Sequence, residues 1–129
     1  MSMFLVVFVI TVQPKWKNES QDAQVEDHNI TVVRICSCSN MTVLKISWPP
    51  PSNINQMDFN FYSLQLRIDG QLYNLTTNEN SYIHEIALAN DVDINVQVDI
   101  NITAINKCNE MSEPLNRSFP LQDIGKPNQ

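Results

Sequence analysis

The sequence is poor in the residues from which catalytic and phosphate-binding sites are built. It contains only two glycines and two histidines. Two glycines cannot supply a glycine-rich phosphate loop, and no G-x-S-x-G, H-E-x-x-H or EF-hand calcium pattern occurs. We therefore expect no enzyme activity, no cofactor and no metal site.

The few titratable residues that could form a site are dispersed along the chain. His28 falls in a polar stretch, and His84 falls in a predicted strand, where a structural role in the sheet is favoured over a catalytic one. Asp91 and Asp93 could contribute to a cation site, although a solvated strand end is the favoured interpretation. No Arg-Gly-Asp tripeptide occurs, so integrin binding through that sequence is not supported.

Basic residues are also scarce. Eight lysines and arginines stand against 14 acidic residues, which gives a formal net charge of -6. Because nucleic acids are bound by basic patches, this balance argues against a nucleic-acid partner. The length of 129 residues suits a single domain that is large enough to bury a core.

No apolar run reaches the length of about 20 residues that a membrane-spanning helix needs. The longest covers residues 3–12, which is the length of a signal-peptide core. We predict a signal peptide at residues 1–13; the alternative is that Met1 is not the true start and that the run is a strand of an upstream domain. Residues 14–28 are polar and aperiodic and are expected to form a flexible leader, within which Trp16 either packs back on the domain or is exposed.

Six N-x-S/T sequons occur, where roughly two are expected by chance from the frequencies of the residues. They begin at Asn18, Asn29, Asn40, Asn74, Asn101 and Asn116. This excess favours a glycosylated protein that is secreted or lies on the extracellular side of the cell surface, and the apolar N-terminal run agrees with it. An asparagine-rich genome is the alternative explanation.

The positive signal in the sequence is a set of β-strand patterns. Every second residue from 92 to 104 is apolar, and the residues between them are polar or charged, as in a strand with one buried face. Further strands are predicted at 29–35, 41–48, 59–68, 71–75, 82–88 and 116–124, with turns at 36–40 and at Asp69-Gly70. The pattern at 82–88 leaves open which of its two faces is buried.

These strands predict an all-β domain, a seven-stranded antiparallel β-sandwich over residues 29–124 followed by a linker or tail at 125–129. Its landmarks resemble those of a fibronectin type III domain. They are Ile46-Ser47-Trp48 before three prolines, Tyr62-x-Leu64-x-Leu66, Ile100-x-Ile102-x-Ala104-x-Asn106 and Ser112-x-Pro114. Two positions depart from the family pattern: Val98 stands where a tyrosine is expected, and Asn109 stands where the last loop should hold a glycine.

The resemblance implies one sheet made of the first, second and fifth strands and another made of the remaining four. Asn74, Asn101 and Asn116 would then lie on or near the outer face of the second sheet, where glycans would shield it. Cys36 and Cys38 would lie at one pole and Cys108 at the other, roughly 20 Å away, whereas a disulfide needs Cα atoms within about 7 Å. No bond from Cys108 to either is therefore expected, which leaves it free or bridged to a neighbouring domain or chain; a wrong strand assignment would reopen the pairing.

Three loops, at 49–58, 76–81 and 107–113, would share one pole of this sandwich, and loops on a rigid scaffold are where recognition usually occurs. Met57, Phe59 and Met111 are the candidate apolar anchors for a partner at this pole. The alternatives are that Phe59 belongs to the core and the methionines have no special role. The sheet of the first, second and fifth strands is the other surface left for protein contact.

The favoured function is a non-enzymatic extracellular protein-binding module, part of an adhesion or cytokine-type receptor ectodomain with neighbouring domains in a longer chain. Its expected partners are a protein and N-linked glycans. One alternative is a carbohydrate-binding or accessory module of a secreted enzyme, for which Trp16 and Tyr73 are the candidate aromatic residues. Another is a stand-alone secreted effector or soluble decoy.

Overall fold

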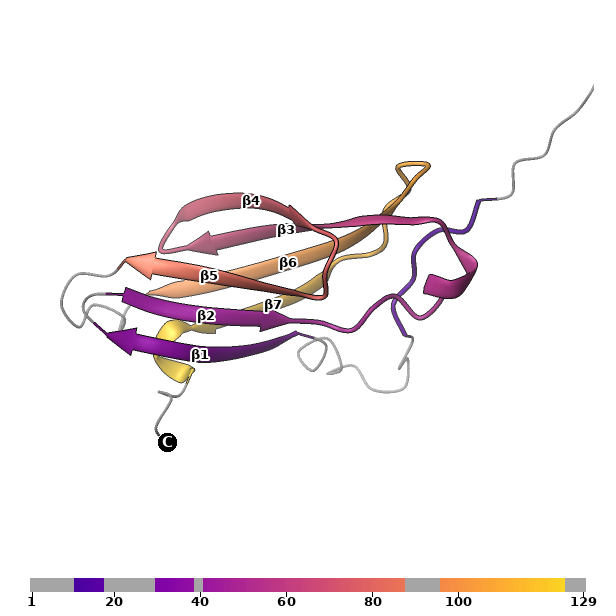
Figure 1. The fold of residues 1–129 in the computed structure, drawn as a ribbon. Helices are drawn as coiled ribbons and strands as arrows, with labels where there is room; N and C mark the ends of the chain where they lie inside the picture. The colour runs from indigo at the N-terminus through magenta and orange to yellow at the C-terminus, as the bar shows by residue number, and fades with distance from the viewer. Residues whose placement is uncertain (1–10, 18–29, 39–40, 88–95, 125–129) are drawn as a thin grey trace, which may run out of the picture.

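The computed structural model describes residues 11–17, 30–38, 41–87 and 96–124. Several predictions lie outside these ranges and concern most of the signal peptide and the tail at 125–129, together with the residues Asn18, His28, Asn29, Asn40, Asp91 and Asp93. The described residues form two β-sheets that pack face to face (Figure 1).

The strands are β1 (Thr31–Cys38), β2 (Met41–Ser47), β3 (Phe59–Ile68), β4 (Gln71–Thr77), β5 (Ser81–Ala87), β6 (Gln97–Asn106) and β7 (Leu115–Pro120), and the short 3-10 helices are η1 (Ile54–Gln56) and η3 (Leu121–Asp123). One sheet has the order β1-β2-β5 and the other the order β4-β3-β6-β7. All neighbouring strands are antiparallel. The predicted seven-stranded antiparallel sandwich is confirmed, and this division of the strands is the one that the resemblance implied, so the fold is fibronectin type III-like.

The core lies between the two sheets and is centred on β3 and β6. Leu64 and Leu66 of β3 and Ile102 and Ala104 of β6 are fully buried, and Trp48 covers one end of the core after β2. The predicted inward parity is therefore confirmed for both central strands where they are described. Full burial of each large apolar side chain contributes about 1.5–3 kcal/mol, so this seam supplies most of the force that holds the sheets together.

The structure also decides which face of β5 is buried. Ile86 joins the core, and the His84 ring lies 4.8 Å from the ring of Tyr73 on β4, in the opposite sheet. Ile83 and Glu85 are exposed on the other side. The larger apolar set, which contains Tyr82, His84 and Ile86, is thus the inward one.

The turn predicted at residues 36–40 is wrong for residues 36–38, which extend β1 and pair with β2 from Val43 to Met41. A register shift between Arg34 and Cys36 lets one extra residue fit into β1. The serine and asparagine content of residues 36–40 predicts a turn, but backbone pairing of residues 36–38 with β2 outweighs that local preference. Likewise, the last predicted strand ends at Pro120 and is followed by η3.

The two ends of the sandwich carry different loops (Figure 1). The end of β1 and the start of β2 lie at one end, and the loop after β6 that contains Cys108 lies at the other. Cys108 is a free, exposed thiol. This confirms the prediction that Cys108 lies at the opposite end of the sandwich from the end of β1 and the start of β2.

Two arginines join the sheets along the edge where β1 approaches β7. The Arg34 side chain is buried and donates from Nη2 to the carbonyl oxygen of Leu121, at 3.0 Å. Arg117 donates from Nη1 to the carbonyl oxygen of Ile30, at 2.9 Å, and its guanidinium lies 5.2 Å from the centre of the Phe119 ring. Both bonds end on backbone carbonyls, so they tie β1 to the residue that follows β7, and β7 to the residue that precedes β1.

Candidate functional site

Three loops meet at the end of the sandwich opposite the β1–β2 connection, as predicted (Figure 1). They follow β2, β4 and β6 and cover residues 48–58, 78–80 and 107–114. We call this end the loop pole. The candidate partner-binding residues were placed here by sequence, and the structure now shows how each of them is oriented.

Of the three predicted anchors, Met57 is buried, and Phe59 is only partly exposed because its ring packs 4.6 Å from that of Tyr62. Met111 is 52% exposed. The structure therefore removes Met57 and Phe59 as apolar side chains that a partner could reach at this pole, and it leaves Met111. The alternative in which Phe59 packs on the core is the one that the structure supports.

The loop after β6 is organised by Asn106, the last residue of that strand. Its side-chain oxygen accepts hydrogen bonds from the backbone N–H groups of Cys108 and Glu110, at 3.0 and 2.9 Å. Ser112 then closes the loop, because its hydroxyl accepts from the Ala104 N–H at 2.9 Å. At Asn109 the backbone φ is 64°, a conformation that asparagine adopts more readily than most residues, and this explains how it replaces the expected glycine.

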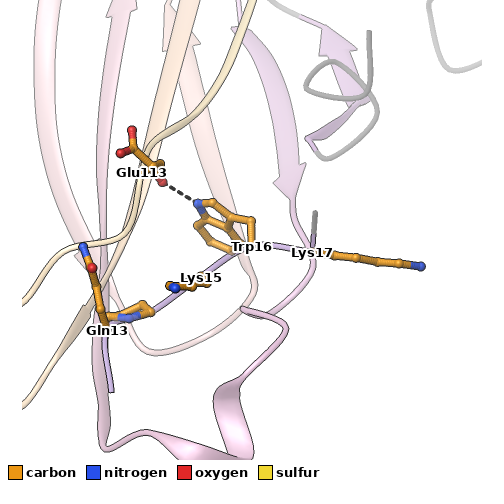
Figure 2. A pocket seen from close by; sticks show the side chains of 6 residues that line it. Gln13, Lys15, Trp16, Lys17 and Glu113 are labelled. Carbon is orange, nitrogen blue, oxygen red and sulfur yellow. Dashed lines mark hydrogen bonds between the residues drawn. The ribbon is translucent and has the colours of Figure 1, made fainter. Parts of the chain in front are cut away.

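Residues 11–17 lie against the loop pole in an extended conformation (Figure 2). Their exposure alternates along the segment, with Pro14 buried and Trp16 half-buried between exposed neighbours. The sequence predicts a signal peptide up to residue 13 and a flexible leader from residue 14. Residues 14–17 are held by the domain instead, which corrects the expectation of a flexible leader there and agrees with Trp16 packing back. Val12 and Gln13 are also bonded to the domain, so a signal peptide compatible with this docking would end before them and not at residue 13.

The segment is held largely through its backbone. Asn53, in the loop after β2, accepts from the Lys15 N–H through Oδ1 at 3.0 Å and donates through Nδ2 to the Gln13 carbonyl at 2.8 Å. Ser52 donates its backbone N–H to the Lys15 carbonyl at 2.7 Å. Asn106 donates to the carbonyl oxygen of Val12 at 3.0 Å. The loops after β2 and β6 thus hold the segment from two sides.

Tyr62 provides the aromatic surface under the segment. Its ring stacks on the Trp16 indole with centroids 6.4 Å apart and an angle of 11° between the planes. Its hydroxyl accepts a hydrogen bond from Asn80, at 2.7 Å. Burial raises the pKa of Tyr62, and the bond from Asn80 opposes that shift in part. Figure 2 shows the Trp16 indole N–H donating to the backbone carbonyl of Glu113.

A half-open pocket of about 370 Å³ lies beside the docked segment. It is lined by Gln13, Pro14, Lys15, Trp16, Lys17 and Glu113. The side chain of Gln13 crosses to the opposite loop and donates to the Met111 carbonyl at 2.6 Å. Hydrogen bonds from Asn106 and Thr11 lower the pKa of Glu110, which keeps a negative charge next to the start of the segment.

The outer face of the four-stranded sheet is polar and carries three of the sequons. Asn74, Gln65, Asn101 and Asn116 are paired in sequence across β4, β3, β6 and β7, so their Cα atoms form one row. Asn74 and Asn116 are exposed, and Asn101 is partly exposed. The predicted placement of these three asparagines on one outer face is confirmed; their glycosylation stays a prediction. We call this surface the sequon face.

The outer face of the three-stranded sheet is different. Val33 pairs with Lys45, and Lys45 pairs with Ile83, so these side chains form a row across β1, β2 and β5. Val33 is 50% exposed, Ile83 54% and Ile35 45%. We call this surface, with Glu85 at its border, the β1-β2-β5 face. An antiparallel sheet normally turns polar residues to water, so apolar side chains gathered here need an explanation.

Several of these features have no signal in the amino-acid sequence. Asn53 lies in a polar loop and looks like an ordinary turn residue. In β1 the buried parity contains Arg34, while the exposed parity contains Val33 and Ile35. Hydropathy alone would therefore assign the two faces of β1 the wrong way round, and only the pairing with β2 reveals the exposed apolar row.

The aromatic residues proposed for carbohydrate binding do not form an exposed platform. Trp16 is stacked on Tyr62, and Tyr73 is half-buried against His84. Burial lowers the pKa of the His84 imidazole, and the negative charge of Glu85 raises it by a smaller amount. Among the described residues, no three potential metal ligands lie close together, and no helix there is long and apolar enough to cross a bilayer.

No protein-family model and no curated protein matches this sequence. Solved structures similar to it include the following two. The Twitchin kinase region from C. elegans has 17% identity and a TM-score of 0.48 over 80% of this chain, and the central fibronectin-III array of RIM-binding protein has 13% identity and a TM-score of 0.39 over 70%. This chain spans only 15% and 34% of the lengths of those two chains. With TM-scores below 0.5 the two matches carry no functional weight, and the fold assignment depends on the strand order.

Proposed function

We propose that this fibronectin type III-like chain is a non-enzymatic, extracellular protein-binding module of the kind found in adhesion or cytokine-type receptor ectodomains, and that it binds its partner through the β1-β2-β5 face. The observation that supports this most strongly is the cluster of half-exposed apolar side chains on that face. Val33 and Ile35 on β1 and Ile83 on β5 are each about half exposed, and they lie on the two edge strands of one sheet, on either side of β2.

Single exposed apolar residues are common on protein surfaces, but contiguous ones mark contact surfaces. Lys45 lies between Val33 and Ile83 in the same row, and Glu85 is two residues further along β5. An apolar centre with a few charges is the usual composition of a protein–protein interface. A protein partner with its own apolar patch, bordered by charges of both signs, would fit this face.

The extracellular location is supported by the opposite face. Its row of sequon asparagines would place bulky, solvated glycans on one side of the sandwich, whereas no described residue of β1, β2 or β5 begins a sequon. A module that is glycosylated on one side and apolar on the other can approach a partner in only one orientation. The apolar run at residues 3–12 agrees with secretion.

The binding face is tested with a photo-reactive amino acid placed at Ile83 in the glycosylated full chain. Irradiation with extracellular and membrane proteins of the source organism should give a discrete cross-linked protein, and excess unlabelled chain should suppress it. The same probe at Gln65 on the sequon face is the matched control and should give none. Cross-linking at Gln65 alone, or at neither position, would contradict the proposal.

Two charge variants refine the test once that protein is in hand. Ile83→Glu should weaken its binding by about tenfold or more, because a carboxylate would be buried in an apolar contact, whereas Gln65→Glu should leave binding unchanged. Both positions are exposed, so neither variant should alter the unfolding midpoint much. If sedimentation shows instead that the chain pairs with itself and that Ile83→Glu abolishes the pairing, the separate partner is ruled out.

The location is tested separately by expressing the chain with its own N-terminus in eukaryotic cells. Recovery from the medium or the cell surface, with a mass that falls on treatment with peptide N-glycosidase, is the expected result. An unglycosylated chain retained in the cytosol would disprove the extracellular location without affecting the test of the binding face.

A further inference from the structure

The docked segment at residues 11–17 is bound in the way that a protein binds an extended peptide. It belongs to neither sheet, and its contacts cross from the N-terminal part of the chain to the loops after β2 and β6. The amide of Asn53 makes two hydrogen bonds to the segment's backbone, to Lys15 N–H and to Gln13 C=O. An amide side chain that pairs with both a donor and an acceptor of a peptide backbone recognises its extended conformation whatever the side chains are.

Two side chains of the segment are buried or stacked against the domain, and that of Gln13 donates to the Met111 carbonyl. Pro14 is fully buried, and Trp16 is stacked on Tyr62 with its indole N–H bonded to the Glu113 carbonyl. Thr11, Lys15 and Lys17 are exposed. The docking site therefore selects a proline followed two residues later by a tryptophan, in an extended backbone.

The wall of this site is held in place without help from the segment. The Tyr62 ring packs edge-on against Trp48, with centroids 5.3 Å apart, and against Phe59 at 4.6 Å. Asn80 holds its hydroxyl. This aromatic surface would thus remain if the segment left, so this part of the site is preorganised for a ligand.

We propose that this docking site, made of Ser52, Asn53, Tyr62, Asn106 and Glu113, is a binding site for extended peptides that carry a Pro-x-Trp sequence. Residues 11–17 are its intramolecular occupant and keep it closed until a partner's segment of the same chemistry displaces them. This site is separate from the β1-β2-β5 face and does not depend on it.

The resident segment and an added peptide compete for the same site, and this competition determines how tightly the peptide is seen to bind. A segment tethered to its own site acts at an effective concentration of about a millimolar, so an added peptide binds weakly while the resident segment is intact. Weakening the resident segment should therefore uncover the site. This expectation distinguishes a displaceable occupant from a segment that is a permanent part of the core.

The experiment uses the full chain and a fluorescent peptide with the sequence of residues 11–17, with binding followed by fluorescence anisotropy. In the chain variant Pro14→Ala/Trp16→Ala, the peptide should bind at least about tenfold more tightly than in the unchanged chain. Adding Asn53→Ala to that variant should weaken the binding by about fivefold or more. Asn55→Ala, an exposed neighbour in η1, is the matched control and should have no effect.

A peptide in which both the proline and the tryptophan are alanine should not bind either chain. The proposal is overturned if the peptide binds the unchanged chain and the double variant equally, or binds neither. It is also overturned if the double variant loses its β-sheet circular dichroism, because the segment would then be needed for folding.

Hydrogen exchange of the unchanged chain gives an independent readout. The Lys15 N–H donates to the Asn53 side chain, and the Ser52 N–H donates to the Lys15 carbonyl, so both amides are protected only while the segment is docked. Both should exchange much faster than the amide of Leu64 in β3, because the segment opens without global unfolding. Equal protection of these amides and the core amide would show that the segment never leaves, and it would overturn the proposal.

Discussion

The side chain of Asn106 connects the loop after β6 with the N-terminal segment. Its Oδ1 accepts from two backbone N–H groups of the loop, and its Nδ2 donates to the Val12 carbonyl and to the Glu110 carboxylate. An aspartate carboxylate can only accept and a leucine side chain can do neither, so neither could replace this amide. This buried residue explains why an asparagine stands at the end of β6 and how the loop pole is coupled to the docked segment.

His84 should make the stability of the domain depend on pH. Burial lowers its folded-state pKa below the ordinary value of 6.5, so as the pH falls through about 6.5 the unfolded chain takes up a proton before the folded chain does. The free energy of unfolding should therefore fall over this range and level off below the folded-state pKa. Above 6.5 the imidazole is neutral in both states and has no such effect.

The measurement compares urea unfolding midpoints of the original chain and of His84→Phe between about pH 7.5 and pH 5. Phenylalanine can keep the ring contact with Tyr73 and Tyr82, and it removes the proton uptake. The difference between the two chains isolates His84 from carboxylates that titrate at lower pH. Parallel pH profiles for the two chains would show that this histidine is not responsible.

At the scale of single residues, burial could be predicted best in strands where apolar and polar residues alternate. Leu64, Leu66, Ile100 and Ile102 could all be assigned to the core from alternation alone. Asn53 could not be assigned a role, because its contacts are with residues about 40 positions away and depend on how the N-terminal segment returns to the domain. Such a return has no local signature in the sequence.

At the scale of elements, the β3–β4 hairpin is the connection that the sequence specified most fully. Asp69 and Gly70 both have positive φ, 51° and 84°, as a two-residue hairpin turn requires. Where the sequence contains no such signal, the ends of the strands were predicted less accurately. Residues 36–38 pair with β2 although their composition favours a turn, and the chain leaves β7 after Pro120 to form η3, where a continuing strand was predicted.

Gly70→Ala should destabilise the domain by about 1 kcal/mol, because a Cβ disfavours the left-handed backbone conformation. No heavy atom lies within 4 Å of the position that the new Cβ would take, so the cost comes from the backbone and not from a clash. Chemical denaturation measures it. Asp69→Asn is the matched control and should change the free energy of unfolding by less than about 0.5 kcal/mol, since asparagine also tolerates positive φ. An equal effect of the two variants would exclude this explanation.

At the scale of the whole molecule, the sandwich has two unlike faces and two unlike ends. The sequon face is polar, whereas the β1-β2-β5 face presents Val33, Ile35 and Ile83. The loop pole carries the docked segment, and the other end carries the β1–β2 connection. The amino-acid sequence predicted the first face through its sequons. It did not predict the second, because Arg34 occupies the inward side of β1 and reverses the hydropathy pattern of that strand.

The register of β6 and β7 limits how many glycans the sequon face can hold. Asn101 and Asn116 are directly paired, and side chains that face each other across antiparallel strands have Cβ atoms about 4.5–5.5 Å apart. N-glycans are bulky, and a chain modified at both positions would have to bring two of them together to form this register. Secreted, folded molecules should therefore carry a glycan at one of these asparagines and seldom at both.

Glycopeptide mass spectrometry of the secreted chain measures this occupancy. Asn116→Gln should raise the fraction of molecules with a glycan at Asn101, because the competing neighbour is removed. Asn74→Gln is the matched control and should leave that fraction unchanged, since β3, with Gln65, separates β4 from β6. A majority of secreted molecules with glycans at both Asn101 and Asn116 would contradict the pairing of β6 and β7 on which the sequon face depends.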